Sequence, residues 1–265
     1  MLKHNILPRF ILGLIILFAA SFSVSAKSAP VRADFKNESL SYRVMYKWGL
    51  VNKQAGTATL TARNSGSQLI TKLTAKSESW ADHFYCVRDT LLGSITRENF
   101  RPVYYEKIAH EGSDNKHDRV DYKYPGAKVL GYCTRRAWDK DGELIRNEKR
   151  TLDAYGTTVD MLSAFYYMRA LPYETWQKNH VVTINIYSGK QKELLTIKYL
   201  GEQNIKIDKK TIKCYHITFL FTSDGRTKTS DDMDAWIAAD SQRIPVKLEG
   251  KLKVGKVQCF YTGAL

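Results

Sequence analysis

Alternation of apolar and polar residues dominates most of the chain. In the segment 41–49, Tyr42, Val44, Tyr46 and Trp48 occupy every second position, which is typical of a strand with one buried face. The same period, interrupted by turn-forming Gly, Asn, Asp and Pro residues, predicts about thirteen strands. We expect them at residues 41–49, 51–61, 68–79, 84–97, 102–111, 117–124, 128–138, 181–187, 194–199, 212–221, 233–238, 245–254 and 257–261.

One segment in the middle of the chain follows a different period. Residues 157–170 place their apolar side chains at helical spacing, and Thr157 with Asp160 three residues later resembles a capping box. Pro172 then ends the helix. The sequence therefore predicts an all-β fold, an antiparallel barrel or half-barrel of about thirteen strands with one mid-chain helix. The pattern does not determine whether such a barrel is closed or open.

The N-terminal residues have the composition of a secretory signal. Lys3 and Arg9 flank the start of an apolar run at 10–20, and small residues precede a cleavage position after Ala26. The run is shorter than the roughly 20 residues that a membrane-spanning helix needs. We therefore predict a signal peptide at 1–26 and a single exported β domain at 27–265, which is periplasmic or secreted and does not span a membrane.

The charge of the chain favours acidic partners. The sequence has 41 Lys and Arg against 27 Asp and Glu, and removal of residues 1–26 leaves a formal net charge of +12. Such a balance suits lipid head groups or anionic glycans, and the exported compartment argues against nucleic acid. The basic residues are dispersed along the chain, so a generally soluble, charged surface is an alternative explanation.

Four cysteines fall within predicted strands. An even number in an exported chain permits two disulfides, and buried free thiols are equally compatible with the pattern. No metal-type spacing of Cys or His occurs, and we predict neither a metal site nor a cofactor. The pairing of the cysteines stays open at this point for Cys86, Cys133, Cys214 and Cys259.

Three motifs occur in a fixed order along the chain. They are Y-x-V-x-Y-x-W-G with A-G-x-A at 42–58, D-M-L-S-A-F-Y-Y-M-R at 160–169, and W-I-A-A-D-x-x-R-I-P-V-K-L-E at 236–249. This series resembles the exported bacterial family catalogued as domain of unknown function 3108. The resemblance implies an all-β, barrel-like periplasmic fold, and it brings no activity, cofactor or catalytic residue with it.

The charged residues of these motifs have structural explanations. Asp160 suits a helix N-terminus and Arg169 suits the C-terminal end of the same helix. A pair of Asp240 with Arg243 across a turn would orient a loop, and Glu249 lies on the next predicted strand. The alternative is that Asp160 and Arg169 line a cavity. We expect the structural explanation for all five residues.

Three classes of function remain. We rank first a non-catalytic binding or carrier module for an amphipathic or anionic envelope ligand, a lipid or a glycan, held on an aromatic inner face. An envelope assembly protein ranks second and a hydrolase acting on an envelope polymer third, and no catalytic residue is assigned. A binding module would have an empty aromatic cavity, whereas an assembly protein would have a filled interior and an exposed patch. The ligand-binding candidates are Trp48, Trp80, Tyr104, Tyr166, Arg169 and Trp236.

Overall fold

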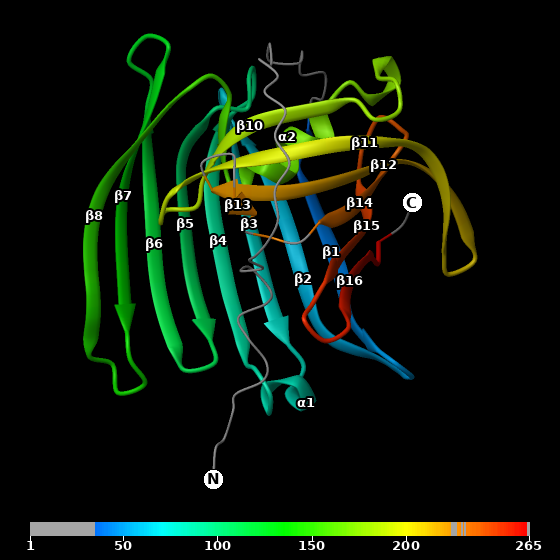
Figure 1. The fold of residues 1–265 in the computed structure, drawn as a ribbon, viewed down its shortest axis with the longest axis horizontal. Coiled ribbons are helices and arrows are strands. Elements are labelled where there is room, and N and C mark those ends of the chain that lie inside the picture. The colour runs from blue at the N-terminus through cyan, green and yellow to red at the C-terminus, as the bar shows by residue number, and fades with distance from the viewer. Residues whose placement is uncertain (1–34, 224–226, 229, 231, 264–265) are drawn as a thin grey trace.

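The computed structural model describes residues 35–223, 227–228, 230 and 232–263, and places their strands in a single sheet of sixteen (Figure 1). The predicted signal peptide at 1–26 lies outside these residues. No helix within the described ranges is long and apolar enough to cross a bilayer.

The first half of the sheet is an antiparallel meander in chain order. Each strand pairs with the next along the chain, so the contacts of this half are local in sequence. Its elements are β1 (Glu38–Trp48), β2 (Val51–Ser65), β3 (Gln68–Ser77), α1 (Ser79–Asp82), β4 (Val87–Thr96), β5 (Pro102–Glu111), β6 (Asp114–Lys123), β7 (Lys128–Trp138) and β8 (Leu144–Tyr155).

The second half continues from the other side of β1, in the order β16-β15-β14-β12-β11-β10-β9, with β13 paired to β12. Its ladders are antiparallel except for the parallel pair β9–β10. The elements are β9 (Thr158–Asp160), α2 (Ser163–Ala170), the 3₁₀ turn Tyr173–Thr175, β10 (Val181–Tyr187), β11 (Lys192–Ile207), β12 (Lys210–Ser223), β13 (Thr227–Lys228), β14 (Met233–Ala238), β15 (Pro245–Lys251) and β16 (Lys256–Tyr261).

The sheet curls into a nearly closed barrel whose two edge strands, β8 and β9, are not joined by a ladder. Side chains bridge this seam. Arg150 on β8 donates to the carbonyl of Lys190 at 2.6 Å, and Asn185 on β10 donates to the carbonyl of Tyr155 at 2.9 Å. The Tyr187 hydroxyl donates to a β7 carbonyl at 3.0 Å. The barrel is therefore open at the backbone level and held together across the seam by side chains.

The helix α2 fills the space between the two halves of the sheet. On one side Leu162 and Tyr166 belong to the buried cluster formed with β1–β7, which includes Tyr105. On the other side Tyr167 and Met168 pack in the cluster formed with β10, β11, β12 and β14. In Figure 1, β10–β12 cross in front of the upper part of the long strands, and β3–β8 extend below them.

The predicted all-β, barrel-like fold with a mid-chain helix is confirmed, but the structure has sixteen strands where thirteen were expected. The three additional strands are β8, β9 and β13. Strand β8 escaped prediction because its inward positions, such as Arg146 and Glu148, carry charges and give no apolar alternation. Strand β13 has only two residues.

The predicted helix at 157–170 is also too long. Residues Thr158–Asp160 pair in parallel with β10, and α2 begins only at Ser163. Asp160 lies two residues before the N-cap Leu162, and its Oδ1 accepts the backbone N–H groups of Leu162 and Ser163 at 2.9 and 2.8 Å. The predicted capping box starting at Thr157 is therefore wrong, because sheet pairing takes the first residues of the segment.

Candidate functional site

A row of alternating charges crosses four strands on the inner face of the sheet. Lys107 on β5 lies directly opposite Asp118 on β6, Asp118 opposite Arg135 on β7, and Arg135 opposite Glu148 on β8. Arg135 Nε is 3.3 Å from Asp118 Oδ1, and Arg135 Nη1 is 3.4 Å from Glu148 Oε2. Opposite charges at directly paired positions stabilise a sheet, so this row is internally consistent.

The row marks the boundary between an apolar and a charged part of the barrel interior. One position further along the same face, Tyr105, Val120 and Cys133 are buried and belong to the apolar cluster around α2. In the opposite direction the face carries Asp89 and Glu111 as well. Because side chains alternate across a strand, the inner surface changes character within two residues.

Two carboxyl groups share one ammonium beside this row. Lys107 Nζ is 2.8 Å from Glu111 Oε1 and 3.9 Å from Asp89 Oδ2. Asp89 is only 2% exposed, and within the described part of the chain neither of its carboxylate oxygens has a hydrogen-bond partner. Burial raises the pKa of Asp89 to about 7, although Lys107 opposes the shift. For Glu111, the nearby ammonium outweighs burial and lowers the pKa.

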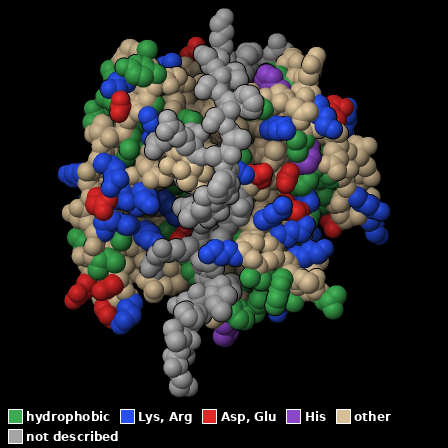
Figure 2. All heavy atoms as spheres, viewed as in Figure 1, with side chains coloured by type: hydrophobic (Ala, Val, Ile, Leu, Met, Phe, Trp, Pro, Cys, Tyr) green, Lys and Arg blue, Asp and Glu red, His purple; other side chains and the backbone are tan. Residues whose placement is uncertain are grey.

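Strand β8 adds two arginines to the same face. Arg150 Nη2 donates to Glu148 Oε2 at 2.8 Å. Arg146 has buried Nε and Nη2 atoms without a hydrogen-bond partner among the described residues. In the left half of Figure 2, Lys and Arg side chains gather over β6–β8. We call the full set of inward-facing charged residues the charged inner face. It consists of Asp89, Lys107, Glu111, Lys116, Asp118, Arg135, Arg146, Glu148 and Arg150.

The alternation within the strands indicates this face, whereas composition and motifs do not. Asp89 shares the parity of the apolar residues Val87 and Leu91, and Lys107 shares the parity of Tyr105. A charge at an inward position of an alternating strand is unusual, because burial of a charge is costly. Several such positions on successive strands point to one polar face.

The structure brings together only two of the predicted ligand-binding residues. Tyr166 and Arg169 lie on α2, and the Arg169 guanidinium lies 5.4 Å from the Tyr166 ring. Both are fully buried, and Arg169 forms two hydrogen bonds with Glu38 at 2.5 and 2.9 Å. A further 4.3 Å contact places the guanidinium over the ring of Phe35. Through these contacts Arg169 links α2 to β1.

The other four candidates occupy separate positions. Trp236 on β14 is buried in the same apolar cluster as Tyr166, and its indole donates to Gln203 at 2.8 Å. Tyr104 faces away from Tyr105 and lies under the guanidinium of Arg119. Trp80, in α1, donates to a β2 carbonyl, and Trp48 is 57% exposed at the end of β1. A ligand at these residues stays a prediction.

The other four motif residues with a structural explanation are held by contacts within the fold. Asp240 Oδ1 accepts the backbone N–H groups of Gln242 and Arg243, so it shapes the turn. The expected Asp240–Arg243 ion pair is replaced, because the Arg243 guanidinium binds Glu174 at 2.8 Å. Glu249 accepts from Lys256 at 2.6 Å, and its pKa falls to about 2 because these bonds outweigh its burial. Burial raises the pKa of Asp160, just before the start of α2, to about 6.

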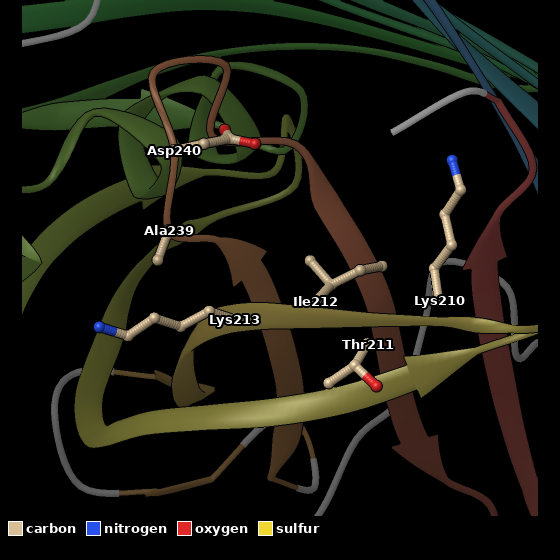
Figure 3. Close-up of a pocket in the computed structure, with 6 residues that line it drawn as sticks. All are labelled: Lys210, Thr211, Ile212, Lys213, Ala239 and Asp240. Carbon is tan, nitrogen blue, oxygen red and sulfur yellow. The ribbon is translucent and has the colours of Figure 1, made fainter.

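Two pockets of the described surface lie beside the long β11–β12 hairpin. One of about 450 Å³ is lined by Lys210–Lys213 with Ala239 and Asp240. Figure 3 shows Lys210 and Lys213 at opposite ends of this pocket, pointing away from one another. Lys213 is paired with Glu202 at 2.8 Å. The two lysines therefore do not converge on a common ligand position.

In the described part of the chain, neither the thiols nor the side chains that commonly bind metals form a catalytic or metal-binding group. All four cysteines are free, and burial raises the pKa of Cys133 to about 11 and of Cys214 and Cys259 to about 12. Among the described residues no three His, Cys, Asp or Glu side chains are grouped so that they could hold a metal ion. The charged inner face is therefore the best candidate site.

Comparison with known proteins supports the fold and identifies the family. A beta-barrel-like protein of domain of unknown function DUF1849 from Brucella abortus superposes with a TM-score of 0.61 at 11% identity, covering 88% of this chain and 97% of that one. A Bacteroides fragilis protein with a YmcC-like fold gives a TM-score of 0.36 at 7% identity, with the same coverages. No curated protein matches in sequence. Residues 41–260 match the family described as protein of unknown function DUF3108, and the chain belongs to that family.

Proposed function

We propose that this chain is a non-catalytic binding module of the bacterial envelope, exported to the periplasm, whose charged inner face holds an anionic or amphipathic envelope ligand. The observation that carries the proposal is a set of buried polar atoms on one face that have no hydrogen-bond partner among the described residues, namely both oxygens of Asp89 and two nitrogens of Arg146. Such groups cost free energy in a folded protein, and a polar ligand would satisfy them.

The composition of the face favours a ligand with an anionic group next to hydroxyl groups. It carries five cationic and four acidic side chains, and the planar fork of an arginine suits a phosphate or carboxylate. Hydroxyl groups would donate to Asp89. The aromatic half of the interior supports no acyl-chain site, because its rings stack on one another, as Tyr122 does on Tyr187 at 5.8 Å. A lipid head group or an anionic glycan therefore fits better than a lipid tail.

The test is native mass spectrometry of the protein purified gently from its own envelope, followed by extraction of any bound molecule. We expect a stoichiometric lipid or glycan, lost in an Arg146→Ala variant that keeps its melting temperature. The matched control is Arg136→Ala, because Arg136 is exposed and lies on the opposite face from Arg135. A bare mass in the wild type, or equal retention in both variants, would contradict the proposal.

A second candidate is an envelope assembly protein that acts through its surface. The filled aromatic interior supports it, as does an exposed apolar end formed by Trp48, Leu50 and Val51. Chemical cross-linking in the intact envelope, with a Leu50→Asp variant as comparison, separates this function from ligand binding. A stoichiometric protein partner that the variant loses would favour assembly.

A hydrolase acting on an envelope polymer is the third candidate. Asp89 and Glu111 flank one ammonium and have pKa values shifted in opposite directions, the asymmetry that a general acid and a general base need. The 2% exposure of Asp89 argues against direct access of a substrate to it. Polymer cleavage that is abolished in Asp89→Asn would raise this candidate above binding.

A further inference from the structure

Two neighbouring hairpin turns at one end of the barrel combine exposed apolar side chains with lysines. The β1–β2 turn has the sequence K-W-G-L-V-N-K at 47–53, and the β15–β16 turn has K-L-K-V-G-K at 251–256. These thirteen residues contain five lysines and no acidic residue. We call the two segments together the basic tip.

The apolar side chains of the basic tip project into solvent. Leu50 is fully exposed, Trp48 is 57% exposed, and Val51 and Val254 are each 42% exposed. Large apolar side chains at the point of a turn gain nothing from packing within the fold. Their concentration here, together with the surrounding lysines, distinguishes this end from the scattered apolar residues that any surface has.

The two turns are packed against each other. The Tyr46 hydroxyl donates to the carbonyl of Val254 at 3.2 Å. Gly255 has φ +77°, and a Cβ there would lie 3.0 Å from Trp48 Cβ and 2.4 Å from the Lys47 carbonyl. Only glycine therefore permits the close approach that holds the turns together. The basic tip is a defined surface built on rigid strands.

Three of the lysines lie side by side on adjacent strands. Lys256 on β16 is directly opposite Lys47 on β1 and Lys251 on β15. Like charges at paired positions destabilise a sheet. Lys256 is neutralised by Glu249 at 2.6 Å, whereas no described carboxylate forms an ion pair with Lys47 or Lys251. This row has a cost within the fold that an external anionic surface would offset.

The helix α1 extends the same surface on the β2 side. Trp80 in α1 donates to the carbonyl of Gln54, and Lys53 Nζ lies 4.5 Å above the Trp80 ring. Phe84 packs edge-on against Trp80 and is 64% exposed. In Figure 2, hydrophobic side chains gather at the lower right, with Lys and Arg side chains above them.

From these contacts we infer that the basic tip docks the protein on the surface of an anionic lipid bilayer, with Trp48, Leu50 and Val51 inserted between head groups and the lysines facing lipid phosphates. Trp and Leu side chains on a Lys-rich surface suit the membrane interface. Each lysine near an anionic surface contributes about a fivefold increase in partitioning. A protein partner would need a strongly acidic groove to match five lysines. This inference is independent of the ligand on the charged inner face.

The test is co-sedimentation of the protein, purified after export by a bacterial host, with vesicles of phosphatidylcholine alone or mixed with phosphatidylglycerol. We expect binding to the anionic vesicles that exceeds binding to the neutral ones about tenfold or more and weakens with added salt. A Lys47→Glu/Lys253→Glu variant should bind about 25-fold less tightly or weaker, taking about fivefold for each lysine. Leu50→Asp should lose about tenfold or more through lost apolar contact.

Matched controls separate docking from general charge and folding. Lys149→Glu and Val181→Asp change an exposed lysine and an exposed valine outside the basic tip, and both should bind within about twofold of the wild type. A blue shift of tryptophan fluorescence on vesicle addition should be reduced in Trp48→Phe, with the remainder coming from Trp80 on the same surface. Equal binding to both vesicle types, undiminished binding by the tip variants, or no binding to anionic vesicles would each overturn the inference. None of these substitutions alters the charged inner face, so the proposed ligand can fail or hold separately.

Discussion

Replacing Arg169 with methionine removes the most deeply buried charge of the described chain. Arg169 is 0% exposed, and its guanidinium donates to Glu38 and to the carbonyls of Gln242 and Arg243 at 2.5–3.0 Å. Methionine has a similar length and fills most of the same space without polar atoms. The substitution therefore deletes the four hydrogen bonds with little change in packing volume.

The expected loss of stability comes mainly from the buried partner that Arg169 leaves behind. The Glu38 carboxylate, only 17% exposed, loses its partner, and breaking one side of a buried ion pair costs about 3–5 kcal/mol. For a chain of this size each kcal/mol corresponds to about 2–4 °C, so the melting temperature should fall by about 6–20 °C. Adding Glu38→Leu removes the stranded carboxylate, and the double variant should recover much of the loss.

Urea unfolding followed by tryptophan fluorescence measures these values, with the slope m checked for constancy. The double-mutant cycle isolates the Arg169–Glu38 ion pair, because the two carbonyl contacts are lost equally in Arg169→Met and in the double variant. A loss below about 1 kcal/mol in Arg169→Met, or no recovery in the double variant, would refute a structural role. Unchanged ligand retention at a lowered melting temperature would separate Arg169 from ligand binding.

Three further predictions concern the seam, the buried carboxyl group and the thiols. Asp89→Asn should stabilise the protein by about 1–2 kcal/mol at pH 8 and by less at pH 5. The pKa of Asp89 in the folded protein, about 7, lies above its usual value. The wild type therefore loses stability as the pH rises from about 4 to 7, and its stability stays at that lower level at higher pH. Urea titrations at the two pH values measure this, and a larger gain at pH 5 would contradict it. Gly131→Ala would place a Cβ 2.7 Å from the Tyr187 ring; we expect a loss of about 1–3 kcal/mol and faster hydrogen exchange in β10, and unchanged exchange would show that this contact does not hold the seam. In the folded protein a thiol reagent at pH 8 should leave the buried cysteines, such as Cys133, almost unreacted, whereas denaturant should expose four thiols; fewer than four would indicate a disulfide.

The sequence predicts most of the fold because alternation directly reports which strands have one buried face. It misses β8, since an inward face of Arg146, Glu148 and Arg150 produces no apolar signal. It also overextends the helix, because Thr158–Asp160 has helical spacing and yet gains more from pairing with β10. Both errors arise where tertiary contacts outweigh the local pattern.

The candidate site is harder to predict, because residue type does not reveal which side chains the helix α2 covers. The chemistry of Tyr166 and Arg169 suits ligand binding, but the fold buries both in its core. Parity within strands does indicate that Asp89 and Lys107 point inward. What no local pattern shows is that these inward charges lie beyond the part of the barrel that α2 fills.

The charged inner face and the basic tip lie toward the same end of the long strands. Register connects them: Gly56 on β2 pairs with Ser77 on β3, Lys76 with Arg88 on β4, and Val87 with Glu111 on β5. The apolar core around α2 occupies the other part of the interior and supplies the packing that the fold needs. Buried polar atoms without hydrogen bonds and opposed lysines add nothing to that packing and cost free energy. Function best explains why both of these destabilising features occur at one end of the barrel. A protein docked through the basic tip would bring its charged inner face near the lipid surface from which an anionic ligand could come.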